Sequence, residues 1–366
     1  MFWLNAKSRM KAKREITPAG FAPSGKRSNV CWGVLPALAL CFSTVGWSQV
    51  ARGFPGHHHP QLQLPAAVPL ANLAAADAQA GASYRFVTIN VPGTTNAGAS
   101  SINDDGLVTG NYADSDSNER GFVWKDGVLR KVEYPGALYT YLWAVNNHGV
   151  AIAYYGDGTT NHTVLYSVES GTWTPLPDIP GYSDNEGYGL NDDGFAVGNA
   201  YEINTTVYPS VTTSVAWIWN PNTRMYSFFA VPGSAQYSTA PNGINNKGQV
   251  AGWYADSSGI YHGYIKEYGT YTTIDFPGAS YTFPDGLSNT GVLQGQILTA
   301  APTYAAEGFT GTSGGVFAVV DYPGPFMTSL VGINDQGDVC GEYWEDANPN
   351  VGFAFVAFRT GPGPEP

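Results

Sequence analysis

The sequence is short of charged residues, and of basic ones in particular. Of its 366 residues 13% are charged, and 17 are Lys or Arg against 29 Asp or Glu. A charged fraction about half of the usual ~25% argues against coiled coils and long surface helices. Aromatic residues make up 14% of the chain, which argues against disorder. We therefore expect a folded domain that is not built from long helices.

The few basic residues are concentrated near the N-terminus. Seven of the 17 precede residue 28, and an apolar run from Val30 to Val45 follows and ends in Gly46-Trp47-Ser48. A basic segment, an apolar core and small residues at the cleavage position are typical of a secretory signal peptide, which we predict over residues 1–48. An uncleaved anchor is the weaker alternative, because the run falls short of the ~20 residues that cross a bilayer and Pro36 interrupts it.

Without residues 1–48 the chain keeps 10 basic and 28 acidic residues, a net charge of −18. Such a surface repels phosphate, so we expect no nucleic-acid partner and no membrane insertion after cleavage. Cysteine is also scarce: Cys31 and Cys41 fall in the signal peptide, which leaves Cys340 without a disulfide or zinc partner. We expect a monomer that is secreted to the periplasm or outside the cell.

Residues 49–82 are rich in Pro, Ala and Gln and show no alternation of apolar and polar residues. This composition predicts a flexible linker between the signal peptide and a folded region over 83–360. Residues 361–366, which are mostly Gly and Pro, are expected to be a disordered tail.

What the chain has in abundance is glycine, proline and a repeat. There are 45 Gly and 25 Pro without a three-residue period, which excludes collagen and favours many turns. The dipeptide Pro-Gly recurs at Pro92, Pro135, Pro180, Pro232, Pro277 and Pro323, at intervals of 43 to 52 residues. A period of this length indicates repeated supersecondary units.

A second signature follows each Pro-Gly in phase. It is an apolar residue, then Asn, two variable residues and Gly, with Ser288 in place of Asn in the fifth copy. Asn can accept hydrogen bonds from nearby backbone amides and Gly can adopt a positive φ, so the signature predicts a tight hairpin turn. The turn residues are Asn103, Gly106, Asn146, Gly149, Asn191, Gly194, Asn245, Gly248, Asn334 and Gly337.

Each unit of about 45 residues has room for four short antiparallel strands, which fits a blade of a β-propeller. A solenoid is the main alternative, but a parallel β-helix would not need three hairpins in each unit. An extra strand, 86–91, precedes the first full unit, and the last unit ends after its third strand. We therefore predict an all-β, six-bladed propeller in which the N-terminal strand closes the last blade.

The stretch from Ile244 to Ala279 carries a family resemblance. It reads Ile-Asn-x-x-Gly-Gln-Val-x-Gly, then His262-Gly263-Tyr264, and ends in Pro-Gly-Ala. In this it resembles the bacterial extracellular HAF repeat, and residues 84–360 resemble an array of such repeats. The resemblance implies secretion and a propeller-like fold and transfers no catalytic residue. Units two and three depart most, with Ala153 in place of Gly and an insertion from Tyr201 to Thr213.

Aromatic residues gather in the predicted connections from the outer strand of one unit to the inner strand of the next. Aromatic rings beside carboxylates suit stacking on sugars and hydrogen bonding to hydroxyls. The alternative is that the rings fill the space between blades. The candidate ligand-binding residues are Tyr139, Tyr141, Trp143, Tyr182, Tyr188, Tyr237, Tyr281 and Phe283.

One loop is a weak candidate for calcium. Asp114, Asp116 and Asn118 alternate as oxygen ligands do in calcium loops, but the turn Gly at the sixth position is missing. No other cofactor is indicated.

No serine-nucleophile elbow, zinc-protease motif or phosphate loop occurs in the sequence. We therefore expect a secreted, non-enzymatic module that binds an extracellular ligand, a glycan or a protein. The alternative is a carbohydrate-active hydrolase or lyase that uses carboxylates near the propeller axis; among 28 acidic residues, the sequence selects no pair.

Overall fold

The computed structural model describes residues 83–204, 211–300, 305–345 and 351–361. The predicted signal peptide, the predicted linker and all but the first residue of the predicted tail lie outside these ranges. The described residues form strands and turns and contain no helix. They therefore include no helix that is long and apolar enough to cross a membrane. The all-β prediction is confirmed.

The strands form antiparallel sheets in which neighbours along the chain pair with one another. Four sheets have four strands each. The first contains β2 (Ala97–Ile102), β3 (Val108–Ala113), β4 (Glu119–Lys125) and β5 (Val128–Val132). The second contains β14 (Ser234–Ile244), β15 (Val250–Asp256), β16 (Tyr261–Glu267) and β17 (Thr270–Ile274). The third contains β18 (Tyr281–Leu287), β19 (Val292–Leu298), β20 (Ala306–Thr312) and β21 (Phe317–Val319).

The fourth of these sheets joins the two ends of the folded region. It contains β22 (Met327–Ile333), β23 (Val339–Trp344) and β24 (Gly352–Arg359), and its outer edge is β1 (Tyr84–Thr88). The pairing of β1 with β24 is antiparallel and runs from Tyr84 opposite Arg359 to Thr88 opposite Phe355. A strand from the beginning of the chain therefore covers the edge that the last strand would otherwise expose.

The remaining eight strands form two four-strand groups. One group is β6 (Tyr139–Val145), β7 (Val150–Gly156), β8 (Asn161–Ser167) and β9 (Trp173–Pro175). The other is β10 (Asp184–Leu190), β11 (Ala196–Asn204), β12 (Val211–Asn220) and β13 (Met225–Phe229). A single parallel bridge between Asp184 and Asn161 joins the groups into one eight-stranded sheet.

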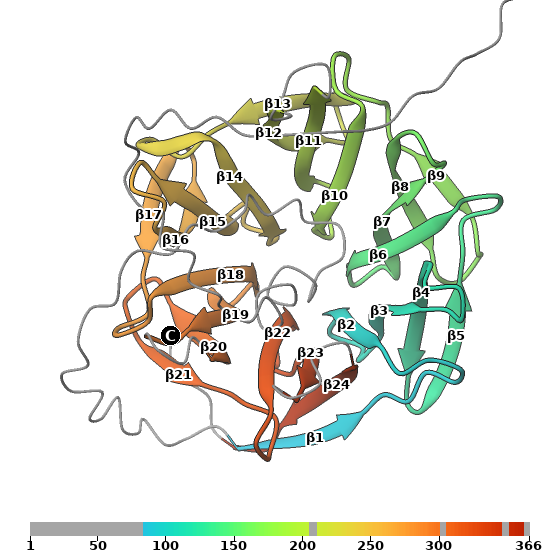
Figure 1. The fold of residues 1–366 in the computed structure, drawn as a ribbon, viewed down its shortest axis with the longest axis vertical. Coiled ribbons are helices and arrows are strands. Elements are labelled where there is room, and N and C mark those ends of the chain that lie inside the picture. The colour runs from blue at the N-terminus through green and yellow to red at the C-terminus, as the bar shows by residue number, and fades with distance from the viewer. Residues whose placement is uncertain (1–82, 205–210, 301–304, 346–350, 362–366) are drawn as a thin grey trace, which may run out of the picture. The chain divides into compact units, whose positions relative to one another are not determined.

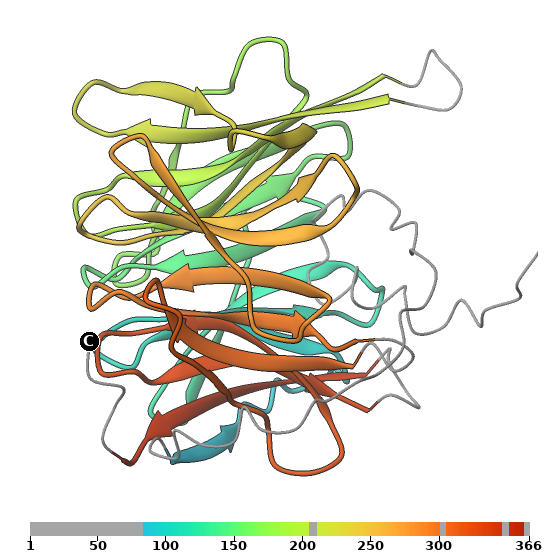
Figure 2. The same ribbon diagram turned by 90° about the vertical axis from the view of Figure 1, so that its left-hand side faces the viewer.

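The sheets stand radially around a common axis, with β2, β6, β10, β14, β18 and β22 nearest to it (Figure 1). The fold is therefore propeller-like. Seen from the side, the hairpin of β11 and β12 projects beyond the other strands (Figure 2). That hairpin contains the insertion noted in the third unit.

The core lies between the faces of neighbouring sheets. One cluster joins Ala99 and Phe122 of the first sheet to Cys340 and Val356 of the sheet that closes on β1, and all four side chains are buried. The middle strands are covered on both faces, which explains why β4 carries a continuous buried run, Gly121–Trp124, rather than an alternating pattern.

Candidate functional site

A cavity of about 110 Å³ lies on the axis, where the innermost strands and their hairpin turns meet. It has room for more than one water molecule. Concave sites with a few convergent polar groups are where small ligands bind most often. The axial cavity is therefore the candidate site.

Bulges in the inner strands direct side chains into this cavity. The register of pairing shifts in every innermost strand, for example between Gly187 and Gly189 in β10 and between Pro284 and Gly286 in β18. A bulge re-aims the side chain of its extra residue. In each unit the cavity-facing residue lies three positions before the turn Asn or Ser. These residues are Ser100, Trp143, Tyr188, Asn242, Asp285 and Val331.

Three polar side chains in the cavity wall form one corner of it. The Nδ2 of Asn242 donates to Oδ1 of Asp285 at 2.9 Å and to the backbone carbonyl of Pro284 at 3.1 Å. The Nε2 of Gln294 donates to the carbonyl of Val331 at 2.6 Å. Each of the three side chains keeps one buried oxygen that accepts no hydrogen bond from the protein: Oδ1 of Asn242, Oδ2 of Asp285 and Oε1 of Gln294.

Burial strongly perturbs Asp285, which lines the cavity, and two acids that do not line it. It raises the pKa of Asp285 well above its ordinary range, although the hydrogen bond from Asn242 opposes the change. Burial also raises the pKa of Glu342, and the charges of Glu119 and Asp285 raise it further. Glu119 is itself raised to a pKa of about 7, mainly by burial. These groups hold their protons more tightly than exposed carboxyls, as catalytic acids often do.

The hairpin turns form a belt around one end of the cavity. The Asn side chain of each turn accepts from amides of its own hairpin, as Asn146 Oδ1 does from His148 and Val150 at 3.1 and 3.0 Å. Its Nδ2 donates to the backbone carbonyl of the corresponding turn residue in the next unit at 3.0–3.2 Å, from Asn103, Asn146, Asn191, Asn245 and Asn334. The turn glycines Gly106, Gly149, Gly194, Gly248 and Gly337 have φ between +67° and +80°.

The residues that follow the turn Asn or Ser add a second ring. The backbone N–H of each donates to the side-chain Oδ1 of its equivalent in the next unit at 2.7–2.9 Å. The six members are Asp104, Asn147, Asp192, Asn246, Asn289 and Asp335, and the bond from Asp335 to Asp104 spans 231 positions. We call the two rings together the turn belt.

Another buried acid, Glu186 of β10, faces Asn161 of β8. Glu186 accepts from Nδ2 of Asn161 and from the hydroxyl of Tyr188, both at 2.6 Å, and is 1% exposed. Asn161 Oδ1 accepts in turn from the hydroxyl of Tyr139. Burial raises the pKa of Glu186 to about 8, against the effect of its two hydrogen bonds. Glu186 does not line the axial cavity.

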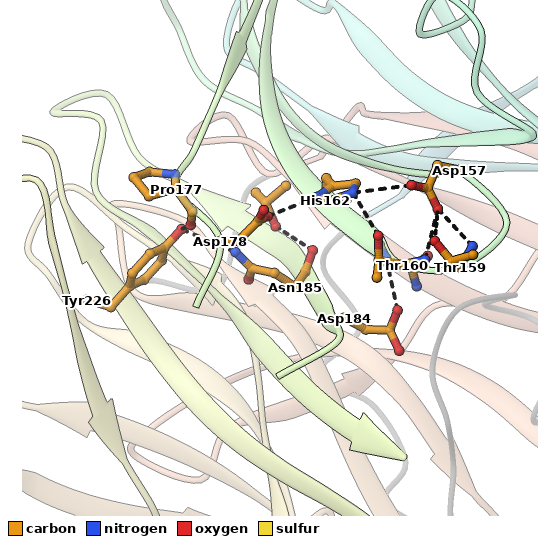
Figure 3. Close-up of polar contacts among 11 residues, drawn as sticks. Asp157, Thr159, Thr160, His162, Pro177, Asp178, Asp184, Asn185 and Tyr226 are labelled. Atoms are coloured by element: carbon orange, nitrogen blue, oxygen red, sulfur yellow. Dashed lines mark hydrogen bonds and ion pairs between the residues drawn. The ribbon is translucent and has the colours of Figure 1, made fainter. Parts of the chain in front are cut away.

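Two histidines are clamped between aspartates away from the cavity. His162 Nδ1 lies 2.9 Å from Asp178 Oδ1, and its Nε2 lies 2.8 Å from the hydroxyl of Thr160 and 3.8 Å from Asp157 (Figure 3). His262 lies in the same way between Asp275 and Asp256. Among the described residues no group of three or more His, Cys, Asp or Glu could hold a metal ion. The clamps tie a hairpin turn to the segment beyond the outer strand.

The structure corrects the expected aromatic face. Five of the eight candidate rings are at most 6% exposed and pack in the core: Tyr141, Trp143, Tyr188, Tyr281 and Phe283. Large rings fill the wedge between adjacent sheets, where they bury the most apolar area. Tyr139 and Tyr182 are half-buried, and only Tyr237, 47% exposed, is open to solvent. Trp143 and Tyr188 nevertheless line the axial cavity.

The carboxylate of the candidate calcium loop is used within its own hairpin. Asp114 Oδ1 accepts from the amides of Asp116 and Asn118, both at 2.9 Å, and Oδ2 pairs with Arg120 at 3.1 Å. The amide of Asn118 contributes most to the lowered pKa of Asp114. The loop is thus closed by its first aspartate, and calcium binding there stays a prediction.

Sequence reasoning did not select Asn242, Asp285, Gln294 or Glu342. The repeat contained a usable signal for the first two, since both lie three residues before the turn residue of their units. The consequence of that position depends on the bulges, which the sequence does not show.

No protein-family model matches the chain, and no curated protein matches it. Solved structures similar in fold include a gluconolactonase from Xanthomonas campestris, with 12% identity over 76% of this chain and 90% of that chain and a TM-score of 0.46. A luciferin-regenerating enzyme has 10% identity over 75% and 95%, with a TM-score of 0.47. The Aleuria aurantia lectin has 8% identity over 76% and 97%, with a TM-score of 0.43. Similarities at this level carry no inference about what this chain does.

Proposed function

We propose that the protein is a secreted, non-enzymatic binding module that takes part of a saccharide into its axial cavity. The observation that carries the proposal is the composition of the cavity wall. Two aromatic residues, Trp143 and Tyr188, lie in it with polar side chains whose oxygens are not used by the protein. An apolar surface beside unused hydrogen-bonding groups suits a ligand with both faces, such as a sugar.

We further propose a closed propeller of six blades, each built from four strands. The support is the turn belt, which passes through six equivalent positions and returns from Asn334 to Asn103, together with the pairing of β1 with β24. Secretion by a signal peptide, membership of the HAF-repeat family and a monomeric state belong to the same proposal. Residues 1–48 support secretion, and the repeat pattern supports the family membership.

The test is a binding measurement on the protein without residues 1–48. A glycan array identifies candidate saccharides, and titration calorimetry measures their affinity for the parent and for Asn242→Ala. We expect saturable binding that weakens at least tenfold in this variant, because Asn242 lines the cavity and its side-chain oxygen is not used by any protein group. Asn220→Ala, in an exposed turn away from the cavity, is the matched control and should bind as the parent does. Saccharide binding that Asn242→Ala leaves intact would contradict the axial site.

A hydrolase or lyase is the second candidate, favoured by the raised pKa values of Asp285 and Glu342. Release of reducing sugar or unsaturated product from a panel of polysaccharides tests it. Turnover that disappears in Asp285→Asn or Glu342→Gln would replace the binding proposal by the enzymatic one. Binding without product would leave the module as proposed.

A further inference from the structure

We infer that the axial cavity recognises a primary ammonium group, which donates to Oδ1 of Asn242, Oδ2 of Asp285 and Oε1 of Gln294. The inference rests on the proposal that this cavity is the binding site, and it names the chemical class of the ligand: a small amine, with an amino sugar as the saccharide form.

The orientations of both amides are fixed by their neighbours. Asn242 and Gln294 each donate an N–H to a backbone carbonyl, a contact that an amide oxygen could not make. Their oxygens therefore face away from those carbonyls. Asn242 is 7% exposed and Gln294 is fully buried, so neither oxygen is solvated as a surface amide would be. An acceptor left unused in such a position is costly.

The three side chains are neighbours in the cavity wall. Asn242 and Asp285 are hydrogen-bonded to each other at 2.9 Å. The amide oxygen of Gln294 lies 3.2 Å from the point where a Cβ on Gly286, the residue after Asp285, would stand. A side chain at Gly286 would crowd this amide, whereas glycine leaves the space open.

The cavity is electrostatically suited to a cation. Its described lining contains Asp104, Asp192, Asp285 and Asp335 and no Lys, Arg or His. The acids of the turn belt already accept hydrogen bonds from neighbouring turns, so Asp285 is the one with an oxygen left over. Burial raises the pKa of Asp285, and an adjacent cation is the kind of partner that favours its ionised form.

An ammonium group matches this corner better than a hard metal ion does. It has three N–H donors for three acceptors. Calcium takes six to eight oxygens, and the corner offers three that the protein does not use. Trp143 and Tyr188 line the same cavity, and aromatic faces attract ammonium groups as well.

The experiment compares two sugars that differ in one substituent. Glucosamine and glucose are titrated into the protein without residues 1–48, with methylammonium chloride as the smallest amine probe and calcium chloride as the metal probe. We expect glucosamine to bind at least tenfold more tightly than glucose. In Asp285→Asn, which keeps the shape of the side chain, the ratio should fall to about one. Asp321→Asn changes a half-buried acid outside the cavity, which accepts from the amide of Gly308, and should keep the parent ratio; circular dichroism confirms that both variants fold.

The outcomes separate this inference from the proposal beneath it. Equal binding of glucose and glucosamine would overturn the ammonium site and leave the saccharide module standing. Binding of methylammonium that depends on Asp285, with no binding of either sugar, would uphold the ammonium site and end the saccharide proposal. Calcium binding that depends on Asp285, with no amine binding, would overturn the inference, as would a preference for glucosamine that Asp285→Asn retains.

Discussion

The turn belt and the cavity wall lie next to each other on the axis, but residues are repeated from unit to unit in the belt and differ from unit to unit in the cavity wall. At the turn, five units carry Asn and one carries Ser288; three residues earlier, the six units carry six different residues. The belt residues bond to their equivalents in the next unit, so the same geometry is needed six times. The bulge residues face a cavity, where no such contact demands one residue type. The repeated turn residues therefore hold the units together, whereas the bulge residues, which differ from unit to unit, are the ones that can give the cavity its specificity for a ligand.

The largest effect is expected from breaking the belt. Asn146→Ala removes two hydrogen bonds within its hairpin and the bond from Nδ2 to the carbonyl of Asn191 at 3.1 Å. At about 1 kcal/mol for each bond, urea denaturation should show a loss of about 3 kcal/mol in the free energy of unfolding. Asn220→Ala, which removes the same kind of turn bond from an exposed position, should lose far less. If the two variants lost the same free energy of unfolding, the hydrogen bonds of the belt would stabilise the fold no more than an ordinary turn bond does.

A second repeated position should respond slightly less. A Cβ on Gly341 would stand 1.9 Å from the backbone oxygen of Ser329 in the paired strand. Gly341→Ala should therefore force β22 and β23 apart and lower the free energy of unfolding by roughly 2–3 kcal/mol.

The control for this change is Gly314→Ala, whose Cβ would meet only the Thr312 hydroxyl at 3.6 Å. It should unfold near the parent midpoint. In unit two Ala153 occupies the position of Gly341, and there the irregular stretch of the inner strand is longer, from Leu142 to Val145. If Gly341→Ala unfolds with the parent, the inner strands are more adaptable than their contacts indicate.

Glu186, which is not a repeated position, should make the free energy of unfolding depend on pH. Burial raises the pKa of Glu186 from 4.5 to about 8, so within this window the folded state keeps a proton that the unfolded state releases. Stability should therefore fall as the pH rises, by at most about 1.4 kcal/mol per pH unit from this group.

Glu186→Gln removes that contribution. Urea denaturation at pH 5 to 8 should show the variant gaining on the parent as the pH rises. Glu169→Gln, in an exposed turn, should follow the parent at every pH. Parallel profiles for Glu186→Gln and the parent would refute the assignment. A smaller decline should remain in the variant, because burial also raises the pKa values of Asp285 and Glu342 and those of Glu119 and Asp321, the last two to about 7 and about 6.

The smallest effect should come from completing the belt. Among the six residues at the Asn position of the turns, Ser288 is the one without a side-chain amide, and its hydroxyl bonds within its own turn to Thr290 and Val292. Ser288→Asn can donate to the carbonyl of Asn334 as the other turns do, and it should raise the free energy of unfolding by up to about 1 kcal/mol. Ser288→Ala, which cannot make the new bond, should be less stable than the parent. A destabilised Ser288→Asn would show that unit five needs serine for another reason.

Much of the fold could be predicted because its signals are local. The Asn and Gly of each turn act within five residues, and the strands between them are bounded by those turns. The candidate site could be predicted only in part. The aromatic residues were expected in the connections between units, but seven of the eight lie in innermost strands. Their exposure depends on the neighbouring sheets, and five of the eight are buried.

The sequence by itself determined the repeat, the hairpins and the all-β architecture, because the repeat period and the turn residues can be recognised from residues close together in the chain. Only the tertiary structure decided that Asn242, Asp285 and Gln294 meet at the axis. That outcome needs a bulge in each inner strand and a turn belt that brings Asp335 to within a hydrogen bond of Asp104. No local pattern encodes it, since the residues that line the cavity come from six units far apart in the chain.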